Sequence, residues 1–276
     1  MSKTEEDEVE ASRAPLIEHL IELRSRLIRA MAAVLVAFIA CFFFSRPIYN
    51  FLLIPYVWAA SNHGDVPRLI YTAPQEYFLT QLKVALFGAL FIAFPVIATQ
   101  IYKFVAPGLY KNERKAFLPY LVATPILFVA GGLVVIFILL PLAMRFFLSQ
   151  EQPGGADTAA IELLPRVNEY LSLVTGLVFA FGLVFQLPVI LTLLARVGIV
   201  NSAMLKSYRR YAIVVAFVVA AVLTPPDMIS QFGLAIPTIL LYEGSIIAVR
   251  VVERRRAEAE AARVAAEAAG QAQKPA

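Results

Sequence analysis

The sequence predicts an all-α polytopic membrane protein. Hydrophobic residues make up 60% of its 276 residues and charged residues only 16%, which leaves too few polar side chains to cover a soluble domain of this size. The apolar residues form long continuous stretches, and in hydrocarbon every backbone N–H and C=O group needs a partner within the protein. Helices are therefore the expected spanning elements. We expect six of them, at Leu27–Phe44, Tyr77–Phe104, Phe117–Phe147, Tyr170–Ala195, Tyr211–Leu223 and Phe232–Val249.

The lysines and arginines predict how these spans are oriented, because cytoplasmic loops carry an excess of basic residues. Most of them fall in the N-terminal segment, in the loops after the second and fourth spans, and in the C-terminal tail. Both termini are therefore expected in the cytoplasm. The net charge of +4 reflects this asymmetry, and the sequence holds no basic stripe that predicts nucleic-acid binding.

An amphipathic helix is expected between the polar, acidic leader at residues 1–15 and the first span. Leucines recur at helical spacing from Leu16 to Leu27, so the helix should run directly into the membrane. Glu22 lies on another face, four residues before Arg26. A pair at this spacing stabilises a helix by about 0.3–0.5 kcal/mol. Spacing alone therefore favours a local ion pair as the role of Glu22.

Two segments outside the membrane are longer than simple turns. Pro47–Ala59 combines aromatic residues with few charges, which is typical of an interfacial helix at the lipid headgroups. Ser149–Pro165 is expected to be an irregular polar loop, and together the two segments predict an extracytoplasmic cap. At the start of the second span, Lys83 is expected to snorkel outward or to pair with Glu76.

The loop after the second span contains a second isolated carboxylate. Pro107-Gly108 ends the span, and Glu113 follows among three basic residues. Local charge balance is one explanation. The alternative is that Glu113 helps to recognise a guanidinium. This alternative is favoured if Glu113 and Glu22 face a shared surface at the membrane boundary, because partial desolvation there strengthens contacts between a carboxylate and a guanidinium.

The fifth span is unusually short and is joined to the sixth only by Thr224–Asp227. Its apolar part covers roughly 20 Å, against roughly 30 Å of hydrocarbon. Either the helix extends through the snorkelling residues Tyr208–Arg210, or the membrane is locally thinned beside this pair. Asp227 is expected to cap the last helix, in which Glu243 is expected to meet a cytoplasmic-side arginine.

The spans lack the side chains of an intramembrane enzyme. Both histidines, His19 and His63, lie outside the predicted spans, and Cys41 is the single cysteine. A nucleophile with its base, or a metal with its ligands, is therefore not predicted. We expect no enzymatic activity, no metal and no cofactor.

Several ordered motifs run along the chain. They are His19-Leu-x-Glu22-Leu-Arg24-x-Arg26, Thr72-x-Pro74-x-Glu76-x-Phe78, Phe104-x-x-Pro107-Gly108-Leu109-x-x-x-Glu113-Arg114 and Thr224-Pro225-Pro226-Asp227. These motifs are similar to those of the TatC family, the multi-span core of the twin-arginine translocase, and the similarity covers the chain from about Leu16 to Val249.

The resemblance implies a receptor that recognises the Arg-Arg signal peptides of folded proteins and organises the single-span subunits TatA and TatB. Export would be driven by the proton motive force across a bacterial inner membrane, from a complex that is also homo-oligomeric. The translocase domain would span residues 16–250, followed by a charged tail at 251–276. The signal-peptide site implied by the resemblance comprises Glu22, Arg24, Phe104, Pro107, Leu109 and Glu113. The implied contacts with partner subunits are Gln186, Thr224, Pro225 and Asp227.

One position departs from the family pattern. Many members carry a glutamate in the fourth span where this chain has Gln186. An amide can form hydrogen bonds in lipid but cannot titrate. The Gln186 amide is expected either to contact a partner span, or to form a hydrogen bond with a neighbouring helix or with a backbone carbonyl that lacks its helical donor because of Pro188.

The alternative function is an ion-coupled secondary transporter of a small solute. Phe94-Pro95-Val96-Ile97 and Leu187-Pro188-Val189-Ile190 form a weak repeat of proline-interrupted spans, as transporters have. No cluster of midplane ionisable groups accompanies the repeat.

Overall fold

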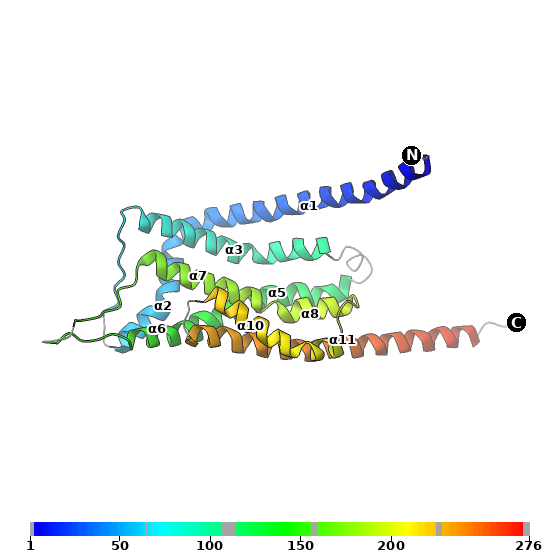
Figure 1. Ribbon diagram of the computed structural model, residues 1–276. Helices are drawn as coiled ribbons and strands as arrows, with labels where there is room; N and C mark the ends of the chain where they lie inside the picture. Colours follow the sequence, from blue (N-terminus) through cyan, green and yellow to red (C-terminus); the bar gives the residue numbers. More distant parts are fainter. Residues whose placement is uncertain (1–2, 64–65, 106–113, 156–158, 225–227, 273–276) are drawn as a thin grey trace. The chain divides into compact units, whose positions relative to one another are not determined.

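The structure, a computed structural model, describes residues 3–63, 66–105, 114–155, 159–224 and 228–272. These residues are mostly helical, which confirms the predicted all-α fold class (Figure 1). The helices are α1 (Lys3–Phe43), α2 (Ser45–His63), α3 (Glu76–Val105), α5 (Arg114–Val134), the π-helix η1 (Val135–Leu139), α6 (Leu140–Leu148), α7 (Val167–Val184), α8 (Leu187–Arg196), α9 (Ser202–Ser207), α10 (Arg209–Leu223) and α11 (Met228–Ala272).

Five helical stretches of the described chain are long and apolar enough to cross a membrane, and they overlap five of the six predicted spans. They are His19–Phe43, Glu76–Phe104, Pro119–Leu148, Val167–Arg196 and Met228–Glu258. The predicted fifth span corresponds to α10, whose 15 residues cover only about 22 Å. Its shortness agrees with the sequence, and six spans remain a prediction.

The described chain packs into two compact units. The first unit comprises Met1–Ile54, Pro67–Pro125 and Leu164–Thr175; the second comprises Pro55–Val66, Ile126–Leu163 and Gly176–Ala276.

In the first unit, α1 packs along α3 (Figure 1). Small residues of α3 make the close approach possible: Val84, Ala85 and Ala89 are fully buried. The helix predicted at Pro47–Ala59 is part of α2. Tyr170, near the start of α7, donates a hydrogen bond from its Oη to the Leu52 carbonyl of α2 at 3.1 Å. This bond fixes the start of α7 against α2.

In the second unit, glycines bring α5 and α7 into contact at Gly131 and Gly182. The π-helix η1 follows α5, and Pro141 comes just after it. Because proline has no N–H to donate, the regular hydrogen-bond ladder is interrupted there, a position at which π-turns occur. The loop predicted at Ser149–Pro165 contains an antiparallel bridge between Gln152 and Ile161, with N···O distances of 3.0 and 2.9 Å.

Replacing Gly131 by alanine is expected to destabilise the second unit. The new Cβ would lie 2.7 Å from the Phe181 carbonyl oxygen, and a backbone atom cannot rotate away. Overpacking of this kind costs about 1–3 kcal/mol, so the thermal unfolding midpoint of the purified protein in detergent should fall.

Gly176→Ala provides the matched control. A Cβ at Gly176 meets nothing within 4 Å, and alanine favours helix over glycine, so the midpoint should stay or rise. Equal midpoints for the two variants would contradict the close contact at Gly131.

Candidate functional site

Two segments that are far apart in the sequence meet where α1 lies beside the end of α3. The His19 and Phe104 rings are stacked, with centroids 4.3 Å apart and planes at 21°. The stacking places the start of the His19–Arg26 motif next to the end of α3. The structure thus brings one residue from each of the two motifs into contact.

Glu22 forms the local ion pair that its spacing predicted. Arg26 Nε donates to Glu22 Oε1 at 3.0 Å, and the Arg26 Nη2 group contacts the same oxygen. The Glu22 side chain nevertheless keeps 36% of its surface exposed. Arg24 lies nearby on α1 and is exposed.

The other half of the predicted signal-peptide site lies in the loop after α3. Phe104 is half-buried. Pro107, Leu109 and Glu113 fall outside the described residues, so their placement relative to Glu22 stays a prediction.

Gln186 lies at the junction between α7 and α8 and is only 5% exposed. Its Nε2 donates to the Gly182 carbonyl at 3.3 Å, a bond to the preceding helical turn. Thr224 follows the last residue of α10, and its buried hydroxyl also bonds the preceding helical turn, donating to the Ala220 carbonyl at 2.9 Å. Pro225 and Asp227 lie outside the described residues. Contact of these residues with a partner span therefore stays a prediction.

The segment containing α9 is tied to α11 by side chains that the sequence analysis did not single out. Tyr242 Oη donates to the Leu205 carbonyl at 2.7 Å, and Glu253 Oε1 accepts from the Ser202 amide at 2.8 Å. Asn201 caps α9 by accepting from the Met204 amide at 2.7 Å. An asparagine followed by serine before a short helix was the available signal for this cap.

Glu243 meets a basic residue as predicted. Arg209 at the start of α10 donates from Nη2 to Glu243 Oε2 at 2.8 Å, and its Nε lies 2.5 Å from Oε1. The bidentate pair joins α10 to α11. Both side chains keep a third or more of their surface exposed, so the net stabilisation is small.

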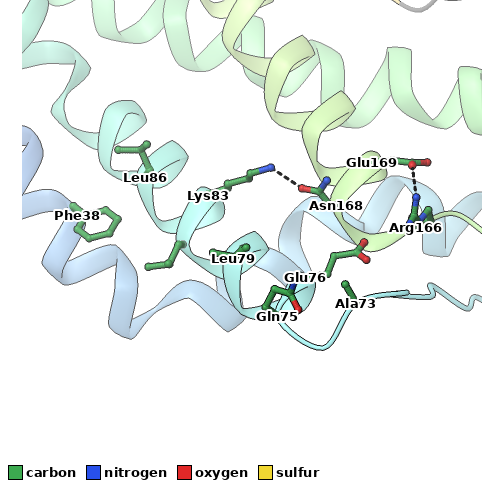
Figure 2. A pocket seen from close by; sticks show the side chains of 11 residues that line it. Phe38, Ala73, Gln75, Glu76, Leu79, Lys83, Leu86, Arg166, Asn168 and Glu169 are labelled. Atoms are coloured by element: carbon green, nitrogen blue, oxygen red, sulfur yellow. Dashed lines mark hydrogen bonds and ion pairs between the residues drawn. The ribbon is translucent and has the colours of Figure 1, made fainter.

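A cavity of about 590 Å³ lies at the other end of the first unit. Its wall includes residues of α1, α3 and α7 (Figure 2). Lys83 was expected to snorkel outward or to pair with Glu76. Its Nζ donates to Asn168 Oδ1 at 2.7 Å instead of to Glu76, and outward snorkelling stays a prediction. Glu76 instead accepts from the Thr72 amide at 2.9 Å. The pairing with Asn168 had no signal in the sequence, because the two residues lie on different helices.

The described residues contain no group of three or more histidine, cysteine, aspartate or glutamate side chains that could hold a metal ion.

Comparison with known proteins gives one consistent result. The family model described as Sec-independent protein translocase protein (TatC) matches residues 18–237. The chain is 50% identical over 253 residues to the TatC protein of Magnetococcus marinus, covering 91% of this chain and 89% of that one. It is 43% identical over 240 residues to TatC of Rickettsia prowazekii, covering 87% and 94%.

A solved structure shows the same similarity in three dimensions. A crystal structure of a twin-arginine translocase receptor, TatC, superposes with a TM-score of 0.72 at 37% identity. The match covers 85% of this chain and 99% of that one.

Glu22→Gln is expected to leave the fold intact. The pair with Arg26 is partly exposed and local, so its loss costs at most about 0.5 kcal/mol. The thermal midpoint in detergent should match that of the unmodified chain and that of Glu258→Gln, which removes the exposed pair with Arg254. A midpoint several degrees lower for Glu22→Gln alone would show that Glu22 is mainly structural.

Proposed function

Because this chain belongs to the TatC family of Sec-independent protein translocase proteins, we propose that it recognises the twin-arginine signal peptides of folded proteins. The family consists of translocase subunits and not of enzymes. This membership favours the translocase prediction over a small-solute transporter.

The observation that carries the proposal is the stacking of His19 on Phe104. Glu22 follows His19 by about one helical turn, so its partly exposed carboxylate is proposed to lie toward the end of α3, from which the chain continues toward Glu113. Two carboxylates at a membrane boundary suit two adjacent arginines. A guanidinium is planar, permanently charged and able to donate in pairs to a carboxylate, whereas a lysine ammonium offers only a point charge.

The remaining residues of the proposed signal-peptide site are given supporting roles. Phe104, Pro107 and Leu109 supply apolar surface for the segment that follows the arginine pair. Arg24 is exposed on α1, where its charge can orient the carboxylates or a polar part of the peptide.

We further propose that the chain crosses a bacterial inner membrane six times with both termini in the cytoplasm. The basic residues that precede the first span and follow the last support this orientation. The short helix α10 is then the fifth span. Since its 15 residues reach about 22 Å, either the snorkelling residues Tyr208–Arg210 extend the span or the bilayer beside it is thinner than usual.

The proposed partners are the single-span subunits TatA and TatB, in a complex with several copies of this chain that uses the proton motive force. The proposed contacts are Gln186, Thr224, Pro225 and Asp227. Gln186 is 5% exposed, so its amide reaches a partner span only when the junction between α7 and α8 opens.

Signal-peptide recognition is tested by photo-crosslinking from the exposed position Leu23 to a precursor with an Arg-Arg signal peptide. Crosslinks should form, and should be lost when the pair is replaced by Lys-Lys, because the paired hydrogen bonds of the guanidinium cannot be reproduced. Glu22→Gln and Glu113→Gln should each lower binding about tenfold or more, since each removes a charge-assisted hydrogen bond.

The control position for the crosslinker is Val251, which is exposed on α11. Equal crosslinks from Leu23 and Val251, or equal crosslinks to both precursors, would overturn the assignment. Full export by Glu113→Gln would remove Glu113 from the site.

The partner contact is tested by Gln186→Leu. Leucine keeps the volume and removes the polar group, so crosslinks between this chain and a TatA or TatB span should weaken. Thr192→Val is the matched control on α8, because the Thr192 hydroxyl bonds only nearby carbonyls of its own helix. Retained crosslinking and export after Gln186→Leu would leave Gln186 with a purely structural role.

A further inference from the structure

The cavity in the first unit joins a charged rim to an apolar wall. Its charged side chains are Glu76, Lys83, Arg166 and Glu169. The apolar part comes from Phe38 of α1 and from leucines of α3 such as Leu79 and Leu86 (Figure 2). Such a division into a polar and an apolar end suits an amphiphilic ligand, and 590 Å³ is within the usual size of ligand sites.

The position of the cavity places it at a membrane surface. Two helical stretches long and apolar enough to cross a membrane begin at its rim, one at Glu76 and the other at Val167. Lys83 lies about two helical turns further along α3. Glu76, Arg166 and Glu169 thus lie at the depth of the lipid headgroups, and Lys83 and Leu86 lie deeper, toward the acyl chains.

Lys83 has unused hydrogen-bonding capacity at this depth. Its ammonium has three N–H donors, and among the residues that the structure describes its one hydrogen bond is to Asn168. Neither carboxylate of the rim is paired with Lys83. Glu76 accepts from Thr72, and Glu169 Oε1 accepts from Arg166 Nη1 at 3.2 Å. A cation near hydrocarbon without a carboxylate partner favours binding of an external anionic group.

The charges of the whole rim indicate which headgroup fits. Lys83 and Arg166 can bind a phosphate, but Glu76 and Glu169 balance them, so a purely anionic headgroup would meet as much repulsion as attraction. A zwitterion with a phosphate and an ammonium matches both signs. A primary ammonium also donates hydrogen bonds to carboxylates, which a quaternary ammonium cannot do.

We infer that this cavity is a binding site for a zwitterionic phospholipid with a primary amine, of the phosphatidylethanolamine class. Lys83 and Arg166 hold the phosphate, Glu76 and Glu169 hold the ammonium, and an acyl chain lies along Phe38 and the leucines of α3. The inference requires that α1 and α3 lie in a membrane, and it is independent of signal-peptide recognition.

The test uses the full chain, purified in a neutral detergent and offered an equimolar mixture of phosphatidylethanolamine, phosphatidylcholine and phosphatidylglycerol with the same acyl chains. Native mass spectrometry then measures the lipid that stays bound. Phosphatidylethanolamine should be retained in preference to both others. Lys83→Gln, which keeps a donor for Asn168 and removes the charge, should lower its retention about tenfold.

Three further variants separate headgroup recognition from general effects. Lys206→Gln removes an exposed cation of α9 and should change nothing. Lys83→Arg keeps the charge and should keep the lipid. Glu76→Gln can still accept from Thr72 and should bring retention of phosphatidylethanolamine down to that of phosphatidylcholine. This last variant also tests the headgroup if Lys83→Gln does not fold.

Several results would overturn the inference. These are equal retention of the three lipids, a preference for phosphatidylglycerol, or the same loss with Lys206→Gln as with Lys83→Gln. Displacement of the bound lipid by inorganic phosphate at equal concentration would also overturn it, because the apolar wall would then contribute nothing.

Discussion

The structure depends on one constraint: a polar group in hydrocarbon needs its partner within the protein. The backbone meets this requirement by forming helices, and several threonine side chains meet it within their own helices. Thr99 donates to the Pro95 carbonyl at 2.7 Å, and Thr175 donates to the Leu171 carbonyl at 2.6 Å. Buried Thr238 bonds the Leu234 carbonyl at 2.7 Å. Each hydroxyl uses the carbonyl one turn before it, so threonine is tolerated in spans that exclude most polar residues.

The sequence predicted the features that follow from this constraint and from spacing along one helix. Long apolar stretches predicted the helices, and the spacing of Glu22 and Arg26 predicted their ion pair. The shortness of the fifth span was also apparent, because it depends only on where charged and proline residues interrupt the apolar run. The similarity to TatC motifs, confirmed by the comparisons, identified the function class.

Contacts between helices were much harder to predict. Glu76 was a natural partner for Lys83 because it lies nearby in the sequence, but packing of α7 supplies Asn168 instead. The π-helix η1 and the bonds from α11 to the α9 segment also depend on how helices meet. The arginine partner of Glu243 was predicted only as a type of residue, since Arg209 comes from a different helix. Such pairs follow from tertiary packing, which hydrophobic spacing does not encode.

The unbroken course of α1 from Lys3 to Phe43 has a mechanical consequence. One helix carries His19 and Glu22 near its middle and Phe38, in the cavity wall, near its C-terminal end. From His19 to Phe38 the helix rises about 28 Å, close to the thickness of the hydrocarbon. Residues 3–43 include no proline apart from Pro15 near the start, so the part between these sites has no proline hinge. This part of α1 is therefore stiff, and a tilt imposed on it at one membrane surface is transmitted to the opposite surface.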